Sequence, residues 1–399
     1  MKKDALLLFI LLTSYALQAN AQSYSTAKEP LTATVVGELA PELGNSSALL
    51  YWEGSLWTSN DHGTLTLHRL DTLTGRTLQT VGCDTSFSDM EEVAQDSDYF
   101  YFGDFGNNHE QLRGDLRILR LRKSDLTHGF CRFDTIAFTY SGYDPNGEGA
   151  DRLPSTDYDC EAMVAVGDSL YLFTKQWTSQ QTTCFALPKE PGIYTALPHC
   201  SINVEGMATG ACHMLFNSSE GTKQVLALCG YSLFVQPFVY LIYGFEGNAF
   251  NEGHHIRLPL DNPMGTQTEA ITSVDGIHYW LTNESFNHFG LSQPAQLLSL
   301  DLSDYMTDYL RPDSTHTQGL PFTIKDNGVT DVHPNPTDGT VTIDLPDIER
   351  VEVLDNSGRL LLQSGDSHTL DLQSLDAGTY MIRIVTQQGS VISRKVVKQ

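Results

Sequence analysis

The chain has 399 residues, and its 49 acidic side chains against 24 lysines and arginines give a formal net charge of −25 at pH 7. Such a chain repels phosphate backbones, and the sequence contains no basic stripe, so we exclude nucleic acid as a partner. No segment beyond the N-terminus approaches the ~20 uninterrupted apolar residues of a membrane-spanning helix. We therefore expect no transmembrane segment in the mature chain.

The N-terminus has the order of a secretory signal peptide. Lys2 and Lys3 precede an apolar run at residues 5–12, and the small residues Ala19 and Ala21 suit signal peptidase. We expect residues 1–21 to be removed and the mature chain to be exported.

Seven cysteines in an exported chain favour disulfides. Two predicted turns, at residues 188–192 and 217–221, each lie between two cysteines that could face each other across a hairpin, and a third pair has weaker support. The expected pairs are, in that order, Cys184–Cys200, Cys212–Cys229 and Cys83–Cys131. The seventh cysteine, Cys160, lies in an apolar strand, and we interpret it as a small core residue rather than a nucleophile.

Four segments repeat one pattern, in which an aromatic residue follows ten positions after a lead residue. Each aromatic lies in an apolar run, and a turn with Gly or Asp separates the two halves, which predicts a strand, a tight turn and a second strand. The lead residues and their aromatics are Ser47 and Trp57, Glu91 and Tyr101, Glu161 and Tyr171, and Glu269 and Tyr279.

A fifth unit is looser, and either Glu205 or Thr209 and Gly210 could hold its lead position. Further strand-like runs follow each pair of strands, and amphipathic helices are almost absent. Repeats of about 40–50 residues with four strands each are typical of a β-propeller. We predict an all-β fold with a propeller over residues 22–310, with five repeats counted and five or six blades. A strand near residues 32–39 could close its ring.

The C-terminal part has a different composition. Proline, glycine and polar residues at 311–330 indicate a linker, and short alternating strands over 331–399 predict a small Ig-like antiparallel β-sandwich. The motifs of this segment contain Pro334, Asn335, Pro336, Gly358, Gly378, Tyr380, Lys395 and Lys398.

On these motifs, residues 331–399 resemble the C-terminal sorting domain of cargo for the type IX secretion system of Bacteroidota. The resemblance implies that the secretion machinery and a sortase are partners, with attachment to surface lipopolysaccharide as an outcome. It places the mature protein at the outer-membrane surface or in the medium. Residues 44–300 are similar to secreted propeller-type proteins of the same phylum whose activity is undefined, with stretches at 56–61, 89–94, 103–108, 159–163 and 170–175.

Equivalent side chains of a propeller meet around one channel, so the repeat predicts a ring of carboxylates. Its members are Glu91, Glu161 and Glu269, with Ser47 and Glu205 completing it. One interpretation is structural, with each carboxylate capping backbone N–H groups of a neighbouring blade. A second is a site for Ca²⁺ or Mg²⁺, because these cations prefer several oxygen ligands, and a third is direct catalysis by the carboxylates.

Polar residues at the ends of the second strands should cluster at one mouth of the channel. They are Asn60, Asp61, Asp104, Asn107, Asn108, Lys175, Asn283 and Glu284. They are either turn formers or the ligands of a catalytic metal ion. The sequence thus supports two functions and leaves open whether the protein is an enzyme. One is a ligand- or protein-binding module, and the alternative is a divalent-metal-dependent hydrolase of phosphoesters, lactones or esters at the channel mouth.

Overall fold

The computed structural model describes residues 25–27, 29–108, 113–143, 157–218, 221–288, 290–310, 331–345, 348–354, 360–386 and 391–399. The chain divides into two units, residues 1–314 and 315–399, which we describe separately. The signal peptide predicted at 1–21 and the linker predicted at 311–330 lie outside the described residues.

The first unit is all-β, as predicted, and its main described strands follow one another in five groups of four, which we number as sheets in chain order, although the second and third groups are joined into one eight-stranded sheet. The first sheet contains β3 (Ser46–Trp52), β4 (Ser55–Asn60), β5 (Gly63–Leu70) and β6 (Thr77–Phe87). The second contains β7 (Met90–Gln95), β8 (Tyr99–Asp104), β9 (Arg117–Arg122) and β10 (Phe133–Tyr140). The third contains β11 (Asp159–Val166), β12 (Ser169–Lys175), β13 (Thr182–Pro188) and β14 (Gly192–Ile202).

The fourth sheet contains β15 (Met207–Ser218), β16 (Gly221–Tyr231), β17 (Pro237–Tyr243) and β18 (His254–Pro259), with the short β1 (Ser25–Thr26) added in parallel. The fifth contains β19 (Thr268–Ser273), β20 (His278–Asn283), β23 (Gln296–Asp301) and β2 (Thr34–Glu38). A small hairpin of β21 (Phe286–His288) and β22 (Leu291–Gln293) precedes β23. Three short helices are η1 (Pro41–Leu43), α1 (Lys123–Thr127) and α2 (Ser303–Leu310).

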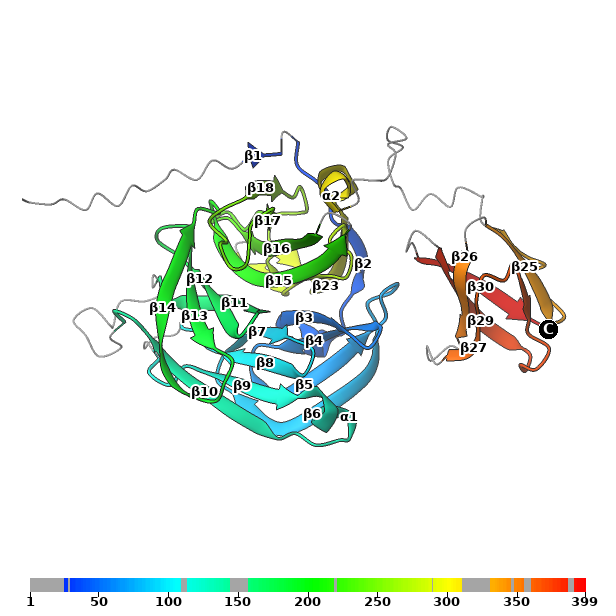
Figure 1. Cartoon of the computed structure of the whole chain (residues 1–399), viewed down its shortest axis with the longest axis horizontal. Coiled ribbons are helices and arrows are strands. Elements are labelled where there is room, and N and C mark those ends of the chain that lie inside the picture. Colours follow the sequence, from blue (N-terminus) through cyan, green and yellow to red (C-terminus); the bar gives the residue numbers. More distant parts are fainter. Residues whose placement is uncertain are drawn as a thin grey trace, which may run out of the picture. The chain divides into compact units, whose positions relative to one another are not determined.

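The five sheets surround a common centre. Their first strands contact one another in the order β3, β7, β11, β15 and β19, and β19 contacts β3. Figure 1 shows β3, β7, β11 and β15 nearest the centre and β6, β10 and β14 at the periphery. The expected closing strand is β2, which pairs antiparallel with β23 and thereby joins the N-terminal segment to the last sheet. Parallel pairing of β10 with β14 also joins the second and third sheets at their outer edges.

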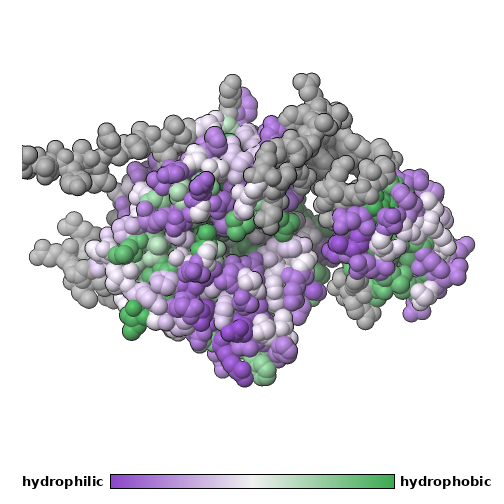
Figure 2. Space-filling view, viewed as in Figure 1, coloured by the Kyte–Doolittle hydropathy of each residue, from purple (hydrophilic) through white to green (hydrophobic). Residues whose placement is uncertain are grey.

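Each sheet buries its two faces against its neighbours, because the core consists of a separate apolar cluster between each adjacent pair. Between the fifth and first sheets, for example, Leu297 packs with Leu49 and Leu56. A single sheet of this kind cannot bury both faces alone, so the contacts between sheets supply most of the hydrophobic stabilisation. The face in Figure 2 is accordingly largely hydrophilic, with apolar side chains in small separate groups.

The disulfide predictions are confirmed for one pair and corrected for two. Cys83 on β6 is bonded to Cys131 after α1. The other five cysteines are free thiols, namely Cys160, Cys184, Cys200, Cys212 and Cys229.

The physical reason for the correction differs between the two hairpins. Cys212 is opposite Ala227 and Cys229 is opposite Gly210, so these two cysteines are diagonal to each other. Cys184 and Cys200 are directly opposite, but the strands shift register immediately after Cys184, and both side chains are free thiols. Burial raises the pKa of the Cys184 thiol well above its usual value.

The second unit contains two described sheets. One is formed by β24 (Asp331–His333), β25 (Thr340–Asp344) and β28 (Thr369–Asp371), and the other by β26 (Ile348–Leu354), β27 (Leu360–Ser364), β29 (Gly378–Thr386) and β30 (Val391–Lys398). One apolar cluster joins them, with Val341 and Ile343 from the first sheet and Val353 and Ile382 from the second. Among the described residues of the whole chain, no helix has the length and apolar character needed to cross a membrane.

Candidate functional site

A β-bulge occurs at the same point of each first strand. The antiparallel register shifts by one residue, so that the extra residue is left out of the ladder. A bulge re-aims the side chain that it carries and interrupts pairing locally. The bulge residues are Ser47, Glu91, Glu161, Thr209 and Glu269, and they form what we call the bulge ring.

Four members of the bulge ring are lead residues of the sequence repeat, and the fifth is Thr209. The structure places Glu205 outside the ring, because β15 begins only at Met207. The Glu205 side chain is exposed, its φ is +50°, and its carbonyl accepts a hydrogen bond from Arg257 Nη2 at 3.2 Å. Thr209 instead bonds to the neighbouring sheet, with its hydroxyl donating to the carbonyl of Thr268 at 2.5 Å.

Lys175, at the end of β12, is the cation of this site. Its ammonium nitrogen lies 2.7 Å from both carboxylate oxygens of Glu161, and the two residues are 4% and 2% exposed. The same ammonium lies 4.7 Å from the ring centre of Trp177 and 5.1 Å from that of Tyr231. Burial alone would lower the pKa of Lys175, but attraction to Glu161 and to Glu269 holds it well above its usual value.

The carboxylates of the bulge ring lie in a strongly acidic environment. Burial raises the pKa of Glu91 well above its usual value, and repulsion from Glu161 and Asp89 adds to this effect. Burial likewise raises the pKa values of Glu161 and Glu269. Gly106 fits against this group because a Cβ there would clash with carboxylate oxygens of Asp89 and Glu91. Lys175 therefore compensates only part of a buried negative charge.

Two predicted mouth residues border this acidic group. Repulsion from Asp61 contributes to the raised pKa values of Glu269 and Glu284. Glu284 is half-buried, and desolvation first and Asp61 second raise its pKa to about 7. The acidic group therefore reaches partial solvent exposure at Glu284.

The other predicted mouth residues have local partners. Asp104 is fully buried between Arg113 and Arg117, at 3.0 and 2.9 Å, and also accepts two backbone N–H bonds. Asn107 donates to the Tyr143 hydroxyl at 2.9 Å. Asn60 and Asn283 donate to backbone carbonyls, and Asn108 is half-buried where the described segment ends. These contacts organise the loops that follow the second strands.

Glu92 is a residue that the sequence analysis did not place in the site. The residue after the bulge is small in the other four sheets, where it is Ala48, Ala162, Gly210 or Ala270. Space there is limited, since a Cβ on Gly210 would lie 2.5 Å from the carbonyl oxygen of Glu269. A glutamate in place of alanine or glycine after the bulge was therefore visible in the sequence and could have marked Glu92 as a residue of the site.

The Glu92 carboxylate crosses from the second sheet to the fourth. It is 1% exposed, and its oxygens accept hydrogen bonds from the backbone N–H of Val93 and of Ala211 on β15, both at 2.9 Å. Burial raises the pKa of Glu92 well above its usual value, while backbone donors, including that of Met163 on β11, act in the opposite direction. Glu92 thus joins the first strands β7 and β15 through its hydrogen bond to Ala211.

The residues present do not fit the Ca²⁺ or Mg²⁺ site considered from the sequence. Throughout the described segments, no set of three or more His, Cys, Asp or Glu side chains is arranged to hold a metal ion. Both oxygens of Glu161 are engaged by Lys175, and Ser47 and Thr209 supply hydroxyls where the ring would need carboxylates. The ammonium group of Lys175 supplies positive charge beside Glu161 and Glu269.

The raised pKa of Glu284 predicts a specific pH dependence of stability. An acid whose folded pKa is about 7, against about 4.3 in an unfolded chain, binds its proton more tightly when folded. Its contribution to the free energy of unfolding is therefore lost as pH rises from about 4.3 to about 7. We expect the free energy of unfolding of Glu284→Gln to fall less steeply with rising pH below pH 7, and to vary with pH as in the unchanged chain above pH 7. Urea unfolding from pH 4.5 to 8.5 measures this, and parallel curves for both proteins would contradict it.

A family comparison identifies the second unit. Residues 331–399 match the family model of the secretion system C-terminal sorting domain. These residues are a type IX sorting domain. The boundaries equal those expected from the motifs, so the resemblance noted in the sequence is confirmed.

The sorting-domain motifs hold the chain end in place. The peptide bonds before Pro334 and Pro336 are cis, and the side-chain Oδ1 of Asn335 accepts a hydrogen bond from the backbone N–H of Val397 on β30 at 2.9 Å. The Tyr380 hydroxyl and the Lys398 ammonium cap the carbonyls of Asp376 and Leu375, at 2.7 and 2.6 Å.

For the remaining motif residues, the structure gives at most the position of the backbone. Gly378 begins β29, and the backbone of Lys395 lies on β30. Gly358 lies outside the described residues.

No curated protein matches the chain. Similar solved structures include PorZ, a surface component of the type IX secretion system of Porphyromonas gingivalis, with 11% identity and a TM-score of 0.30. That match covers 92% of this chain and 46% of PorZ. Another is the periplasmic gluconolactonase PpgL of Pseudomonas aeruginosa, with 13% identity, a TM-score of 0.32, and coverage of 84% of this chain and 92% of PpgL. Similarities this weak carry no conclusion about activity.

Proposed function

We propose that this protein is type IX secretion cargo whose N-terminal unit is a five-bladed β-propeller acting as a binding module. The sorting domain at residues 331–399 and the signal peptide expected at 1–21 support export to the cell surface or the medium. The closed cycle of five four-stranded sheets supports the blade number. Removal of the sorting domain by a sortase, with transfer to surface lipopolysaccharide, is part of this proposal and follows from the resemblance to type IX cargo.

The observation that carries the choice of binding over catalysis is the pairing of Lys175 with Glu161. Both carboxylate oxygens are engaged, and both side chains are almost fully buried, so neither group faces a substrate. Beside the bulge ring, the Glu92 carboxylate accepts hydrogen bonds from the backbone N–H groups of Val93 and Ala211. The bulge ring therefore joins the blades, and recognition is left to the loops.

Three exposed apolar side chains support a binding surface beside the site. Leu233 and Phe234, between β16 and β17, are 52% and 78% exposed, and Met264, between β18 and β19, is 48% exposed. The two loops are linked by a hydrogen bond of 3.1 Å from Gly265 N to the carbonyl of Val235. The first loop follows Tyr231, whose ring faces Lys175, and the second leads into β19 just before Glu269, so both lie at the bulge-ring end of the unit. Adjoining exposed apolar side chains are typical of interaction surfaces.

Export is tested by deleting residues 331–399 in the native host. We expect the truncated protein to accumulate in the periplasm, because it lacks the sorting domain that the secretion machinery recognises. The full chain should reach the surface or medium. Fractionation followed by immunoblotting measures the distribution. Normal amounts of the truncated protein outside the cell would contradict the proposal.

A hydrolase is the second candidate, and Glu284 is the observation that favours it. A half-buried carboxyl with a pKa near 7 is suited to general acid–base catalysis. The test is turnover of p-nitrophenyl acetate, p-nitrophenyl phosphate and δ-gluconolactone, with and without CaCl₂. The binding-module proposal expects none. Turnover that is lost in Glu284→Gln, with the fold retained, would replace it with the hydrolase.

A further inference from the structure

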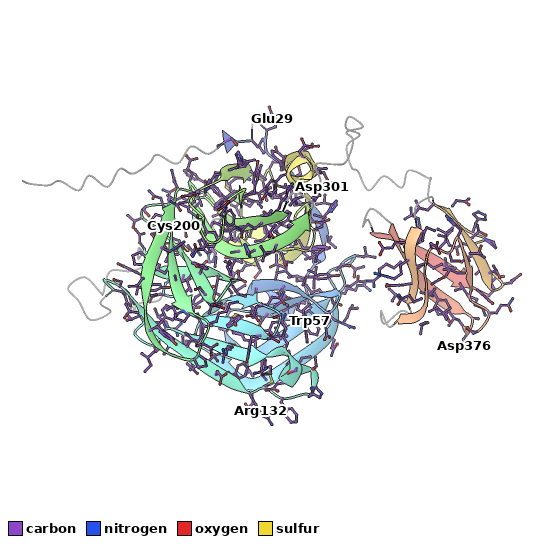
Figure 3. The ribbon with its side chains drawn as sticks, viewed as in Figure 1. Glu29, Trp57, Arg132, Cys200, Asp301 and Asp376 are labelled. Atoms are coloured by element: carbon purple, nitrogen blue, oxygen red, sulfur yellow. A yellow bond between two sulfur atoms is a disulfide. The ribbon has the colours of Figure 1, made fainter. Side chains whose placement is uncertain are left out.

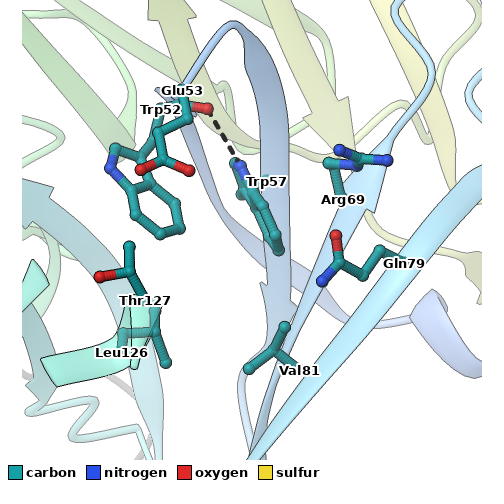
Figure 4. Close-up of a pocket in the computed structure, with 8 residues that line it drawn as sticks. All are labelled: Trp52, Glu53, Trp57, Arg69, Gln79, Val81, Leu126 and Thr127. Carbon is teal, nitrogen blue, oxygen red and sulfur yellow. Dashed lines mark hydrogen bonds between the residues drawn. The ribbon is translucent and has the colours of Figure 1, made fainter. Parts of the chain in front are cut away.

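A cavity of about 240 Å³ lies between the first and second sheets. It is lined by Trp52, Glu53, Trp57, Arg69, Gln79, Val81, Leu126 and Thr127, which are drawn in Figure 4. Ser47 of the bulge ring is near the start of β3, and Trp52 is at its end, so the cavity and the bulge ring occupy opposite ends of that strand. The site is therefore separate from the surface proposed above.

The floor of the cavity is a row of side chains across three strands. Trp57 on β4 is directly opposite Arg69 on β5, and Arg69 is directly opposite Gln79 on β6. Residues paired in this way project from the same face of a sheet. The Trp57 indole is fixed by its N–H bond to the carbonyl of Trp52 at 3.1 Å, the dashed line in Figure 4.

A disulfide joins the two walls. Val81 and Cys83 are on β6 of the first sheet, whereas Leu126 and Thr127 are at the end of α1, shortly before Cys131. The Cys83–Cys131 bond connects these segments, and Figure 3 shows Arg132, the neighbour of Cys131, at the outer edge of the unit. The bond limits movement of the walls, and a pre-organised cavity loses less entropy on binding a ligand.

Polar groups in the cavity are available to a ligand. The Nε atom of Arg69 is buried and has no hydrogen-bond partner within the described part of the chain. A bound acceptor that reached this donor would satisfy it. The amide of Gln79 and the carboxylate of Glu53 add donors and acceptors to the same lining.

The lining selects a neutral ligand with one apolar face. The Trp57 indole is 5% exposed and packs against Trp52, so the half-buried Trp52 indole offers the apolar surface, which packs well against the C–H face of a ring. Arg69 disfavours a cation, and Glu53 disfavours an anion, whereas hydroxyl groups can both donate to Glu53 and accept from Arg69 or Gln79. The volume is near the lower limit of about 300 Å³ for ordinary ligand pockets, which suits one ring. We propose that this cavity binds one pyranose ring of a neutral glycan.

The test uses the purified full chain and the methyl glycosides of glucose, galactose, mannose and N-acetylglucosamine. Two of the four tryptophans line the cavity, so binding should change the intrinsic fluorescence saturably. We expect Gln79→Ala to weaken the affinity about tenfold, since one hydrogen bond is lost, and Trp52→Ala to weaken it further. Thr80→Ala is the matched control, because Thr80 is the exposed neighbour on β6, and it should bind within about twofold of the unchanged chain.

Gln79 is also exposed, so its loss should not disturb the fold, which near-ultraviolet circular dichroism checks. The proposal is overturned if no glycoside gives a saturable change. It is equally overturned if Gln79→Ala and Thr80→Ala bind alike. Preferential binding of a glucuronide or of a proline-rich peptide at Trp52 would show that the cavity serves another class of ligand.

Discussion

We expect Lys175→Met to lower the free energy of unfolding by about 3–5 kcal/mol, which is the usual cost of removing one partner from a buried ion pair. The substitution keeps most of the side-chain volume but leaves the Glu161 carboxylate buried without its counter-ion. Glu269 loses the attraction of the same ammonium group. Urea unfolding at pH 8, followed by circular dichroism, measures the loss.

Two controls separate charge from packing in this variant. Adding Glu161→Gln to Lys175→Met should restore most of the loss, because the carboxylate that Lys175 pairs with directly is then removed. The deficit of Lys175→Met should also shrink as pH falls from 8 to 5, since a protonated Glu161 needs no counter-ion and its pKa is already raised. A deficit below about 1 kcal/mol, or one that is equal at both pH values, would show that the pair does not stabilise the ring.

For Glu92→Ala we expect a loss of about 3 kcal/mol in the free energy of unfolding. Alanine matches the residue after the bulge in the other sheets, yet it leaves the Ala211 N–H without its acceptor and opens a cavity between β7 and β15. Glu92→Gln should cost less, because one oxygen still accepts a backbone N–H. Urea unfolding at pH 7 compares the three proteins.

Glu205→Ala is the matched control, since this glutamate is exposed and its hydrogen bonds to Asn203 and Arg257 are formed by its backbone groups. Its effect should stay within about 0.5 kcal/mol. Equal effects of Glu92→Ala and Glu205→Ala would mean that Glu92 does not join the first strands.

The fold was largely predictable because its repeat is local. A lead residue and an aromatic ten positions later define one hairpin, and the bulge beside the lead residue belongs to that same hairpin. Glu91, Glu161 and Glu269 were therefore found without knowledge of the tertiary structure. The fifth unit was ambiguous because Glu205 is acidic like the other lead residues, whereas the bulge position is held by Thr209.

The features that could not be predicted depend on contacts between segments far apart in the chain. The spacing of residues within one repeat carries no information about such contacts. The Glu92 side chain binds the backbone 119 residues away at Ala211. The bonded cysteines connect two different sheets, whereas both hairpin pairs remain thiols. The cavity at Trp52 combines four strands and a short helix, so the sequence offered no single motif for it.

We infer that the Lys175 ammonium, and not a metal ion, holds the buried carboxylates at the centre of the five sheets. The most direct measurement is a crystal structure of the chain soaked in CaCl₂, with anomalous data collected for calcium. We predict the Lys175 nitrogen within hydrogen-bond distance of both Glu161 oxygens and no anomalous peak among Glu91, Glu161 and Glu269. A calcium ion bound there, with Lys175 turned away, would contradict the account.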